Sequence, residues 1–194
     1  MESLRVLIAD DEEAIRAVLV QLSQALSHQV VGQAHDGQEA VALARTTDPD
    51  MILLDIRMPH MDGLEAARAI TSEKLVPIII VTAHADQALM EQAAEVGVFS
   101  YLLKPVTLQR LAAAISTARA RFFDLQMLRS EVGDLQSALE ARKLVERAKG
   151  ILMRDLRVGE QEAYRWLKRT SSHHNQKLAE VARRIVALEQ RPAH

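Results

Sequence analysis

The chain has 194 residues, with 24 Lys and Arg against 26 Asp and Glu and a hydrophobic content of 48%. This composition is typical of one or two globular domains and argues against a disordered chain. The absence of cysteine excludes disulfide frameworks, thiolate zinc sites and cysteine nucleophiles. No apolar run reaches the roughly 18 residues that span a bilayer, and the acidic start lacks the basic region of a signal peptide. We therefore expect a soluble, cytoplasmic protein with no membrane partner.

Charge is divided unevenly along the chain. Residues 1–117 carry 8 Lys/Arg and 16 Asp/Glu, a net charge of −8, whereas residues 118–194 carry 16 and 10, a net charge of +6. Opposite charge suggests two parts with different partners, although one long charged helix gives the same count. Four of the five prolines lie at or before Pro105 and the fifth is Pro192, so the stretch between them can be helical without interruption. We expect a continuous helix to join the two parts.

Short apolar runs rich in β-branched residues alternate with helical periodicity in the first part. Strands of this kind, with helices between them, predict an α/β fold with a five-stranded doubly wound parallel sheet. Runs that are apolar on both faces are expected where helices cover both sides of the sheet. The predicted strands are residues 5–9, 29–34, 51–55, 77–82 and 100–104.

Polar side chains follow these strands where ligands bind in open α/β sheets, at the carboxyl ends. Asp10 and Asp11 follow the first strand, Asp55 ends the third, Thr82 ends the fourth and Lys104 ends the fifth. Three converging carboxylates repel one another unless a hard divalent cation shares them, and oxygen ligands without His or Cys favour Mg²⁺. The Asp10–Asp11 pair taken alone could instead cap the following helix.

These residues resemble the receiver domain of two-component response regulators, across residues 1–120. The matching features are Asp10-Asp11, Asp55 followed by MPHMDG at 58–63, Thr82-Ala83, and Tyr101 with Lys104-Pro105. The resemblance implies a flavodoxin-like fold in which Asp55 accepts a phosphoryl group from a histidine kinase. It also implies that the carboxylates of Asp11 and Asp55 hold Mg²⁺ together with the backbone carbonyl of Arg57, while Asp10 assists through the waters of the metal.

The same resemblance assigns the remaining residues at this edge. Lys104 would supply the ammonium that neutralises spread phosphoryl charge, and its peptide bond to Pro105 would be cis. Thr82 would hydrogen-bond a phosphoryl oxygen, which leaves space for Tyr101 to rotate into the interior as a switch. Taken alone, each residue has an equally good structural interpretation. Thr82 could simply be a hydroxyl at the end of a strand, and Tyr101 a half-buried ring.

Beyond the receiver, apolar residues recur with alternating steps of three and four. This spacing predicts the a/d seam of a coiled coil over residues 121–141, which we expect to form a parallel homodimer promoted by phosphorylation. The alternative is an amphipathic helix that lies on its own receiver. The seam residues are Leu125, Leu128, Val132, Leu135 and Leu139.

Three further helical segments predict an all-α three-helix bundle over residues 142–190. Its third apolar face includes Leu178, Val181, Ala182, Ile185 and Leu188. Turns are expected around 157–159 and in the polar stretch SSHHNQ at 171–176. Between Arg142 and Arg184 the segment carries 12 Lys/Arg and 5 Asp/Glu, a net charge of +7, which suits binding to phosphate backbones.

This segment resembles the ANTAR domain, the RNA-binding output module of transcription antitermination regulators. The resemblance rests on ARKLVERAKGILM at 141–153, EAYRWL at 162–167 and NQKLAEVARRIV at 175–186. It implies a dimer that binds tandem RNA hairpins, whose loop bases can be read by stacking. Tyr164 is the candidate stacking residue, because it lies off the apolar stripe that contains Trp166. The candidate phosphate contacts are Arg147, Lys149, Arg154, Arg165, Lys168, Arg169 and Lys177.

Together these features predict a response regulator that is phosphorylated on Asp55, dimerises, binds hairpins in leader RNA and antiterminates transcription. No group of residues suits turnover of an external substrate, so we do not expect an enzyme. One alternative is a DNA-binding regulator with a helix-turn-helix, against which the break at 171–176 is longer than the usual turn. Another is a regulator whose basic helical tail binds a protein partner.

Overall fold

The computed structural model describes residues 3–83 and 96–189. The chain forms two compact units, Met1–Gln126 and Met127–His194. Helix α5 (Leu108–Leu156) begins in the first unit and ends in the second, so the predicted continuous helix is confirmed. Because α5 passes through residues 121 and 141 without a break, the predicted boundaries of the linker stay a prediction.

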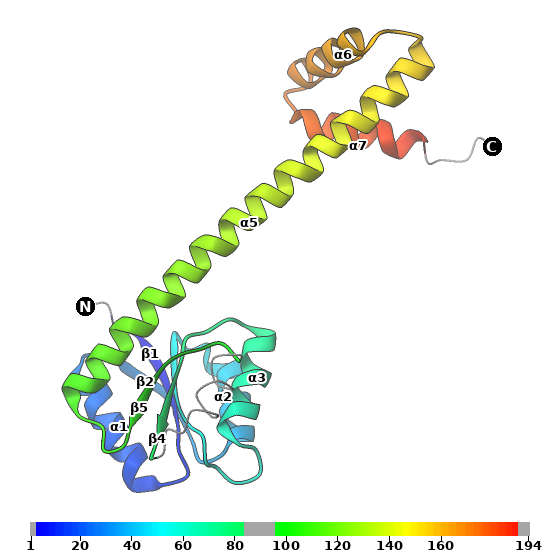
Figure 1. Ribbon diagram of the computed structural model, residues 1–194. Helices are drawn as coiled ribbons and strands as arrows, with labels where there is room; N and C mark the ends of the chain where they lie inside the picture. The colour runs from blue at the N-terminus through cyan, green and yellow to red at the C-terminus, as the bar shows by residue number, and fades with distance from the viewer. Residues whose placement is uncertain (1–2, 84–95, 190–194) are drawn as a thin grey trace. The chain divides into compact units, whose positions relative to one another are not determined.

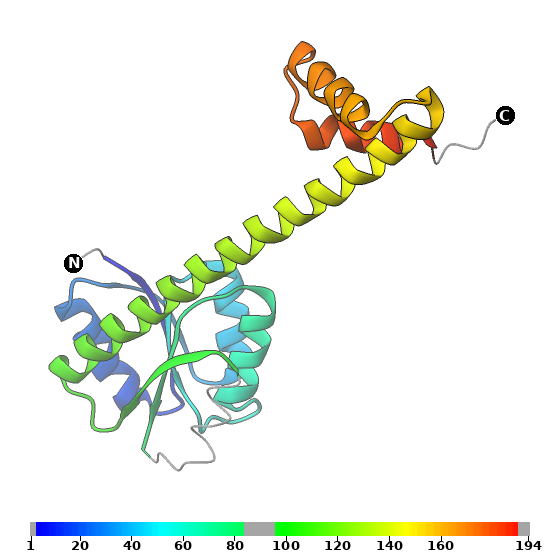
Figure 2. The same ribbon diagram turned by 45° about the horizontal axis from the view of Figure 1, so that its top comes forward.

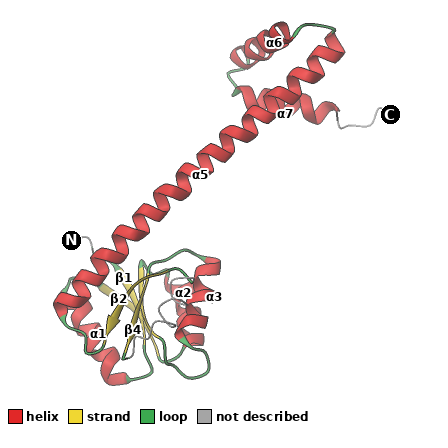
Figure 3. Cartoon of the chain, viewed as in Figure 1, coloured by secondary structure: helices red, strands yellow, loops and turns green. Residues whose placement is uncertain are grey.

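The first unit contains the predicted five-stranded parallel sheet, with strand order β2-β1-β3-β4-β5. Figure 3 shows the strands of this sheet in yellow, with helices in red on either side. This is the flavodoxin-like order: β2 is added on one side of β1, and β3, β4 and β5 are added on its other side, so the order of the strands switches between β1 and β3. All five predicted strands are present, and only the last two differ by one or two residues at their ends. The strands are β1 Arg5–Ala9, β2 Gln29–Ala34, β3 Met51–Asp55, β4 Ile78–Thr82 and β5 Val98–Leu103.

Helices cover both faces of the sheet, as the doubly apolar strands require (Figures 1 and 2). Helices α2 (Gly37–Thr47) and α3 (Gly63–Glu73) pack on one face, in a core that includes Leu7 and Ile52. Helix α1 (Glu13–Ala25) and the first turns of α5 pack on the other, in a core that includes Ile8 and Leu53. The expected helical crossover between β4 and β5 includes residues 84–95 and lies outside the described residues.

The second unit is a small helical bundle built from the end of α5, α6 (Glu160–His173) and α7 (Leu178–Glu189). Its core contains Ala148, Leu152, Ala163 and Leu167, together with Val181 of the predicted third apolar face. The prediction for Leu188 is wrong, since this side chain is 66% exposed. Val186, two residues earlier, is buried in its place.

The connections within this bundle are short. Residues 157–159 join α5 to α6, as predicted, and residues 174–177 join α6 to α7. The expected break at 171–176 is therefore wrong in extent, because Ser171, Ser172 and His173 continue helix α6. A connection of four residues lies within the range of a helix-turn-helix, so loop length does not argue against that motif.

The predicted seam lies along α5 and is exposed after its first residue. Leu125 is partly buried against the core of the first unit. Leu128, Val132, Leu135 and Leu139 are between 51% and 64% exposed. Burial within the first unit therefore accounts for Leu125, while the other four seam residues are exposed along α5.

Within the described ranges, 3–83 and 96–189, no helix combines the length and the apolar character that crossing a membrane demands.

Candidate functional site

Three carboxylates meet at the carboxyl edge of the sheet. Strands β1 and β3 are neighbours, so the side chains of Asp10, Asp11 and Asp55 each offer an oxygen within 4.8 Å of the others. Asp10 is fully buried and Asp55 nearly so, whereas Asp11 is exposed. The sequence prediction that these three residues converge is confirmed.

Lys104 joins this cluster from the end of β5. Its Nζ lies 2.8 Å from Oδ2 of Asp10 and 3.1 Å from Oδ2 of Asp55, and 3.6 Å from Oε1 of Glu12. Burial lowers the pKa of Lys104, but its hydrogen bonds to Asp10 and Asp55 outweigh this effect and raise the pKa above the ordinary lysine value. The ammonium is thus held charged at the centre of the cluster. The Lys104–Pro105 peptide bond is cis, as the resemblance implied.

Asp55 is a buried carboxylate with defined partners. Burial raises its pKa above the ordinary aspartate value, and the hydrogen bond and charge of Lys104 oppose that rise. The backbone N–H of Ile56 donates to its Oδ1 at 2.8 Å. Oδ1 therefore faces the backbone and Oδ2 faces Lys104.

The donor set fits a hard divalent cation. It consists of carboxylate oxygens only, two of which are buried beside one another, and such crowding of negative charge is relieved by a cation. Arg57, whose carbonyl was predicted as a further ligand, lies two residues after Asp55 in the loop between β3 and α3.

The loop after β3 is anchored by a glycine whose role the sequence analysis did not find. The N–H of Gly63 donates to the carbonyl of Ile56 at 2.8 Å, and a Cβ at this position would lie 1.9 Å from the carbonyl oxygen of Asp55. No side chain fits there, so α3 can begin this close to the end of β3 only with glycine. Asp62 and Glu65 form a capping box that fixes the same helix start.

Arg16 is a second residue that sequence reasoning missed. From the first turns of α1 its Nη1 donates to the backbone carbonyls of Asp10, at 2.7 Å, and Asp11, at 3.2 Å. The turn is also held by the N–H of Glu12, which donates to Oδ1 of Asp10 at 3.0 Å. The only signal in the sequence is an arginine five to six residues after the acidic pair.

The predicted switch residues lie on neighbouring strands. Thr82 is buried at the end of β4, where its carbonyl accepts from the N–H of Lys104 at 2.9 Å. Tyr101 pairs with Ile80 in the β4–β5 ladder, and its side chain is 47% exposed. The rotation of Tyr101 toward the interior stays a prediction.

The predicted RNA contacts divide into two groups. Tyr164 is 43% exposed, whereas Trp166 packs against the core of the bundle, as the periodicity indicated. Four cationic residues on α6 and in the following connection are exposed as well. These are Arg165, Lys168, Arg169 and Lys177.

The other three predicted contacts carry ion pairs. Lys149 is buried, and its Nζ lies 2.8 Å from Glu146 and 2.6 Å from Glu160. The structure contradicts its prediction as an available phosphate contact, because the ammonium is covered and already paired. Arg154 lies 2.8 Å from Asp155 and 2.9 Å from Glu189, and Arg147 lies 3.6 Å from Glu189.

Two family models match the chain. The response regulator receiver domain matches residues 6–116, and the ANTAR domain matches residues 133–186. The chain is a response regulator with a receiver domain and an ANTAR domain. The acidic edge described above lies in the receiver domain, and the basic helical bundle lies in the ANTAR domain. These two domains mark a non-enzymatic regulator.

Similar proteins share this organisation in whole or in part. The transcriptional regulatory protein PdtaR of Mycobacterium tuberculosis is 40% identical over 178 residues, which cover 92% of this chain and 87% of that protein. The receiver domain of NarL from Mycobacterium tuberculosis superposes with a TM-score of 0.57 at 37% identity, covering 61% of this chain and 98% of that one. The CheX–CheY–BeF₃–Mg²⁺ complex of Borrelia burgdorferi gives a TM-score of 0.56 at 25% identity, covering 57% and 85%.

Proposed function

We propose that a histidine kinase phosphorylates this regulator on Asp55, and that phosphorylation controls the binding of its ANTAR domain to hairpins in leader RNA. The observation that carries the proposal is the ammonium of Lys104 between Asp10 and Asp55, at 2.8 and 3.1 Å. Phosphoryl transfer depends on positioning and on neutralisation of spread negative charge. A buried carboxylate beside a fixed ammonium provides both.

In the proposed reaction an oxygen of Asp55 attacks the phosphorus of a phosphohistidine. The new P–O bond forms as the P–N bond breaks, and the kinase histidine leaves. Lys104 then exchanges its hydrogen bond with Asp55 for one with a phosphoryl oxygen. Asp11, Asp55 and the carbonyl of Arg57 would hold Mg²⁺, with Asp10 assisting, and the ion supplies charge neutralisation at the phosphoryl oxygens when bound. The similar CheX–CheY complex of Borrelia burgdorferi has been solved with BeF₃ and Mg²⁺, which supports Mg²⁺ as the cation.

Thr82 and Tyr101 would transmit the conformational change from the phosphorylated site to the surface of the receiver domain. The hydroxyl of Thr82 would donate to a phosphoryl oxygen, and Tyr101 would exchange its exposed position for an interior one. Support comes from their placement on adjacent strands, with Thr82 beside the N–H of Lys104.

The proposed output is a homodimer that binds two hairpins. Four seam residues that the single chain leaves exposed, from Leu128 to Leu139, would meet those of a second copy. Two ANTAR domains held together then bind tandem hairpins through effective concentration. We assign base stacking to Tyr164 and phosphate contacts to Arg165, Lys168, Arg169 and Lys177, with Arg147 and Arg154 contributing charge beside Glu189. The proposal places the protein in the cytoplasm, with nascent transcripts.

The test is binding of a tandem-hairpin leader RNA by the full chain, with Mg²⁺ and with or without beryllofluoride, while molecular mass is measured in the same samples. We expect beryllofluoride to raise RNA affinity by about tenfold or more as the mass doubles, a coupling of the size usual in allostery. Asp55→Asn should bind RNA equally with and without it. If RNA affinity changes neither with beryllofluoride nor with Asp55→Asn, phosphorylation does not control RNA binding.

DNA binding is a second candidate function. The short connection between α6 and α7, residues 174–177, permits a helix-turn-helix. A duplex DNA of the same sequence, titrated at matched salt, decides between the two. Preference for hairpin RNA supports our proposal, and preference for the duplex overturns it.

A further inference from the structure

The turn between β1 and α1 carries three acidic residues in a row. Asp10 is buried, whereas Asp11 and Glu12 are exposed. Carboxylate oxygens of Asp10 and Glu12 lie 2.8 and 3.6 Å from Nζ of Lys104, and Asp11 offers an oxygen to the carboxylate cluster with Asp55. Neighbouring negative charges repel one another, so the turn needs interactions that hold it in this conformation.

A side-chain cap does not hold this turn. Glu12 occupies the N-cap position of α1, and its side chain makes no capping hydrogen bond. An N-cap side chain ordinarily accepts a hydrogen bond from the first turn of the helix and so ties the entering chain to it. At α1 the tie between the acidic turn and the helix has to come from another residue.

Arg16 provides this tie through the backbone of all three acidic residues. Its Nη1 donates to the carbonyl of Asp10 at 2.7 Å and to the carbonyl of Asp11 at 3.2 Å. Its own backbone N–H donates to the carbonyl of Glu12 at 3.0 Å. Hydrogen bonds from a guanidinium are charge-assisted and stronger than neutral ones. One residue therefore fixes the path of the chain from residue 10 to residue 12.

The position of Arg16 is unfavourable for the helix itself. Arg16 is the fourth residue of α1, at the end of the helix where unpaired backbone N–H groups leave a partial positive charge. A cation is stabilising at the other end of a helix and opposes the dipole at this one. A residue that breaks such a local preference while making specific contacts beside a functional site is best explained by that site.

We propose that Arg16 is a positioning residue for Mg²⁺, which holds the acidic turn so that the carboxylate of Asp11 points at the ion. The guanidinium has no acceptor and acts through the backbone, not as a ligand. This inference rests on the proposed function, because it takes Asp11 and Asp55 as metal ligands. A role through charge alone has the opposite sign: removing a nearby positive charge would then tighten Mg²⁺ binding, whereas loss of positioning weakens it.

The test is a titration of the full chain with Mg²⁺, followed through the amide NMR resonances of Asp11 and Glu12. Arg16→Met should weaken Mg²⁺ binding by about tenfold, the loss usual when a group that orients a metal ligand is removed. The N–H of Glu12, which donates to Oδ1 of Asp10, should also exchange faster with solvent before Mg²⁺ is added. Arg16→Lys keeps the charge without the planar fork, so its affinity should lie between those of Arg16→Met and the wild type.

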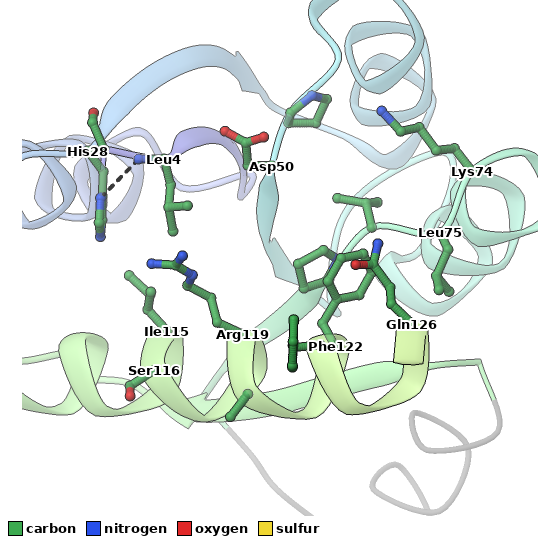
Figure 4. Close-up of a pocket in the computed structure, with 16 residues that line it drawn as sticks. Leu4, His28, Asp50, Lys74, Leu75, Ile115, Ser116, Arg119, Phe122 and Gln126 are labelled. Atoms are coloured by element: carbon green, nitrogen blue, oxygen red, sulfur yellow. Dashed lines mark hydrogen bonds between the residues drawn. The ribbon is translucent and has the colours of Figure 1, made fainter. Parts of the chain in front are cut away.

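Arg119→Met is the matched control. Arg119 and Arg16 are both partly buried and belong to the first unit. Figure 4 shows Arg119 at the other edge of the sheet, where it lines a hollow with Leu4 and His28 at the amino ends of the strands. This variant removes the same charge and should bind Mg²⁺ with wild-type affinity. Asp11→Asn, which removes a proposed ligand, should lose most of the binding.

The outcomes separate this proposal from the set of ligands on which it rests. If Asp11→Asn loses Mg²⁺ while Arg16→Met binds it as tightly as the wild type or more tightly, the ligands stand and the positioning role is refuted. Equal weakening by Arg119→Met also refutes that role. If no saturable shift is seen in the wild type, the proposed ligands and the role of Arg16 both fail. Circular dichroism checks folding, and if Arg16→Met does not fold, wild-type affinity in Arg16→Lys refutes the positioning role.

Discussion

The two charged regions of the molecule are organised in opposite ways. At the carboxyl edge of the receiver domain, Asp10 and Asp55 are buried, and the partly buried Lys104 contacts both of them. Among the described residues of the ANTAR domain, most cationic side chains are exposed, and only Lys149 is both buried and paired. Strand ends bring distant residues to one point, whereas helix surfaces spread charge. A single substitution in the first region should therefore abolish phosphoryl uptake, whereas each substitution in the second should weaken RNA binding only in part.

The largest effect is expected at Asp55, the proposed phosphoacceptor. Asp55→Asn removes the attacking oxygen but keeps the size of the side chain, so phosphoryl uptake from a phosphorylated histidine kinase or acetyl phosphate should fall below detection. The fold should persist, because amide and carboxylate occupy the same volume. Radiolabel incorporation measures uptake, and circular dichroism measures folding. Continued labelling of the folded variant would remove Asp55 from the role proposed for it.

The next effect concerns the packing that supports this edge. Gly63→Ala places a methyl group 1.9 Å from the carbonyl oxygen of Asp55, so α3 must move away. We expect a loss of about 3 kcal/mol in the free energy of unfolding, the upper range for overpacking, together with slower phosphoryl uptake. Denaturant unfolding measures the first quantity.

Gly133→Ala is the matched control for this substitution. A Cβ at Gly133 meets nothing within 4 Å, and the position lies inside helix α5. Alanine should therefore stabilise the chain by about 0.5–1 kcal/mol, since glycine is the poorer helix former. Equal effects of the two substitutions would contradict the close contact at Gly63.

The same contrast explains what the sequence could predict. Asp10, Asp55 and Lys104 were found because parallel strands end at a common edge, which makes position in the chain sufficient. The contact of Gly63 with Asp55 was not predicted, since it depends on how closely the start of a helix approaches a strand. Arg16 was missed for a similar reason, as its acceptors are backbone carbonyls that any sequence carries.

In the helical part, periodicity found the core but not every side chain on its border. Lys149 lies four residues after Val145 and three before Leu152, so helical spacing alone placed it beside the apolar face. Charge was given more weight than spacing, and the prediction was wrong. The exposure of Leu188 and the extension of α6 to His173 likewise depend on where a terminal helix meets its neighbours.

A paired comparison of two lysines sharpens this point. Lys168→Met should weaken RNA binding and reduce the slope of log affinity against log salt by about 1, as expected for one phosphate contact, with little change in melting temperature. Lys149→Met should lower the melting temperature and leave the salt slope nearly unchanged, because it leaves Glu146 and Glu160 without their partner. Filter binding over a salt series and thermal unfolding supply both quantities. If the salt slope falls with Lys149→Met and not with Lys168→Met, then Lys149 contacts a phosphate and Lys168 does not.

The smallest effect is a pH dependence within the ANTAR domain. The hydrogen bond and charge of Lys149 lower the pKa of Glu160 below the ordinary glutamate value. A lowered folded-state pKa means that the pair contributes stability fully above the unfolded-state pKa, and that this contribution is lost as the pH falls through the folded-state value. The melting temperature should therefore decline on the acid side of the glutamate range.

Glu160→Gln isolates this contribution from other acid-sensitive groups. The variant should melt below the wild type at neutral pH and approach it in acid, since the amide does not titrate. Glu162→Gln, in the same helix turn but without an ion pair among the described residues, should melt at a constant difference from the wild type across this pH range. If the gap between wild type and Glu160→Gln stays constant from neutral to acid pH, the pair with Lys149 does not stabilise the bundle through the charge of Glu160.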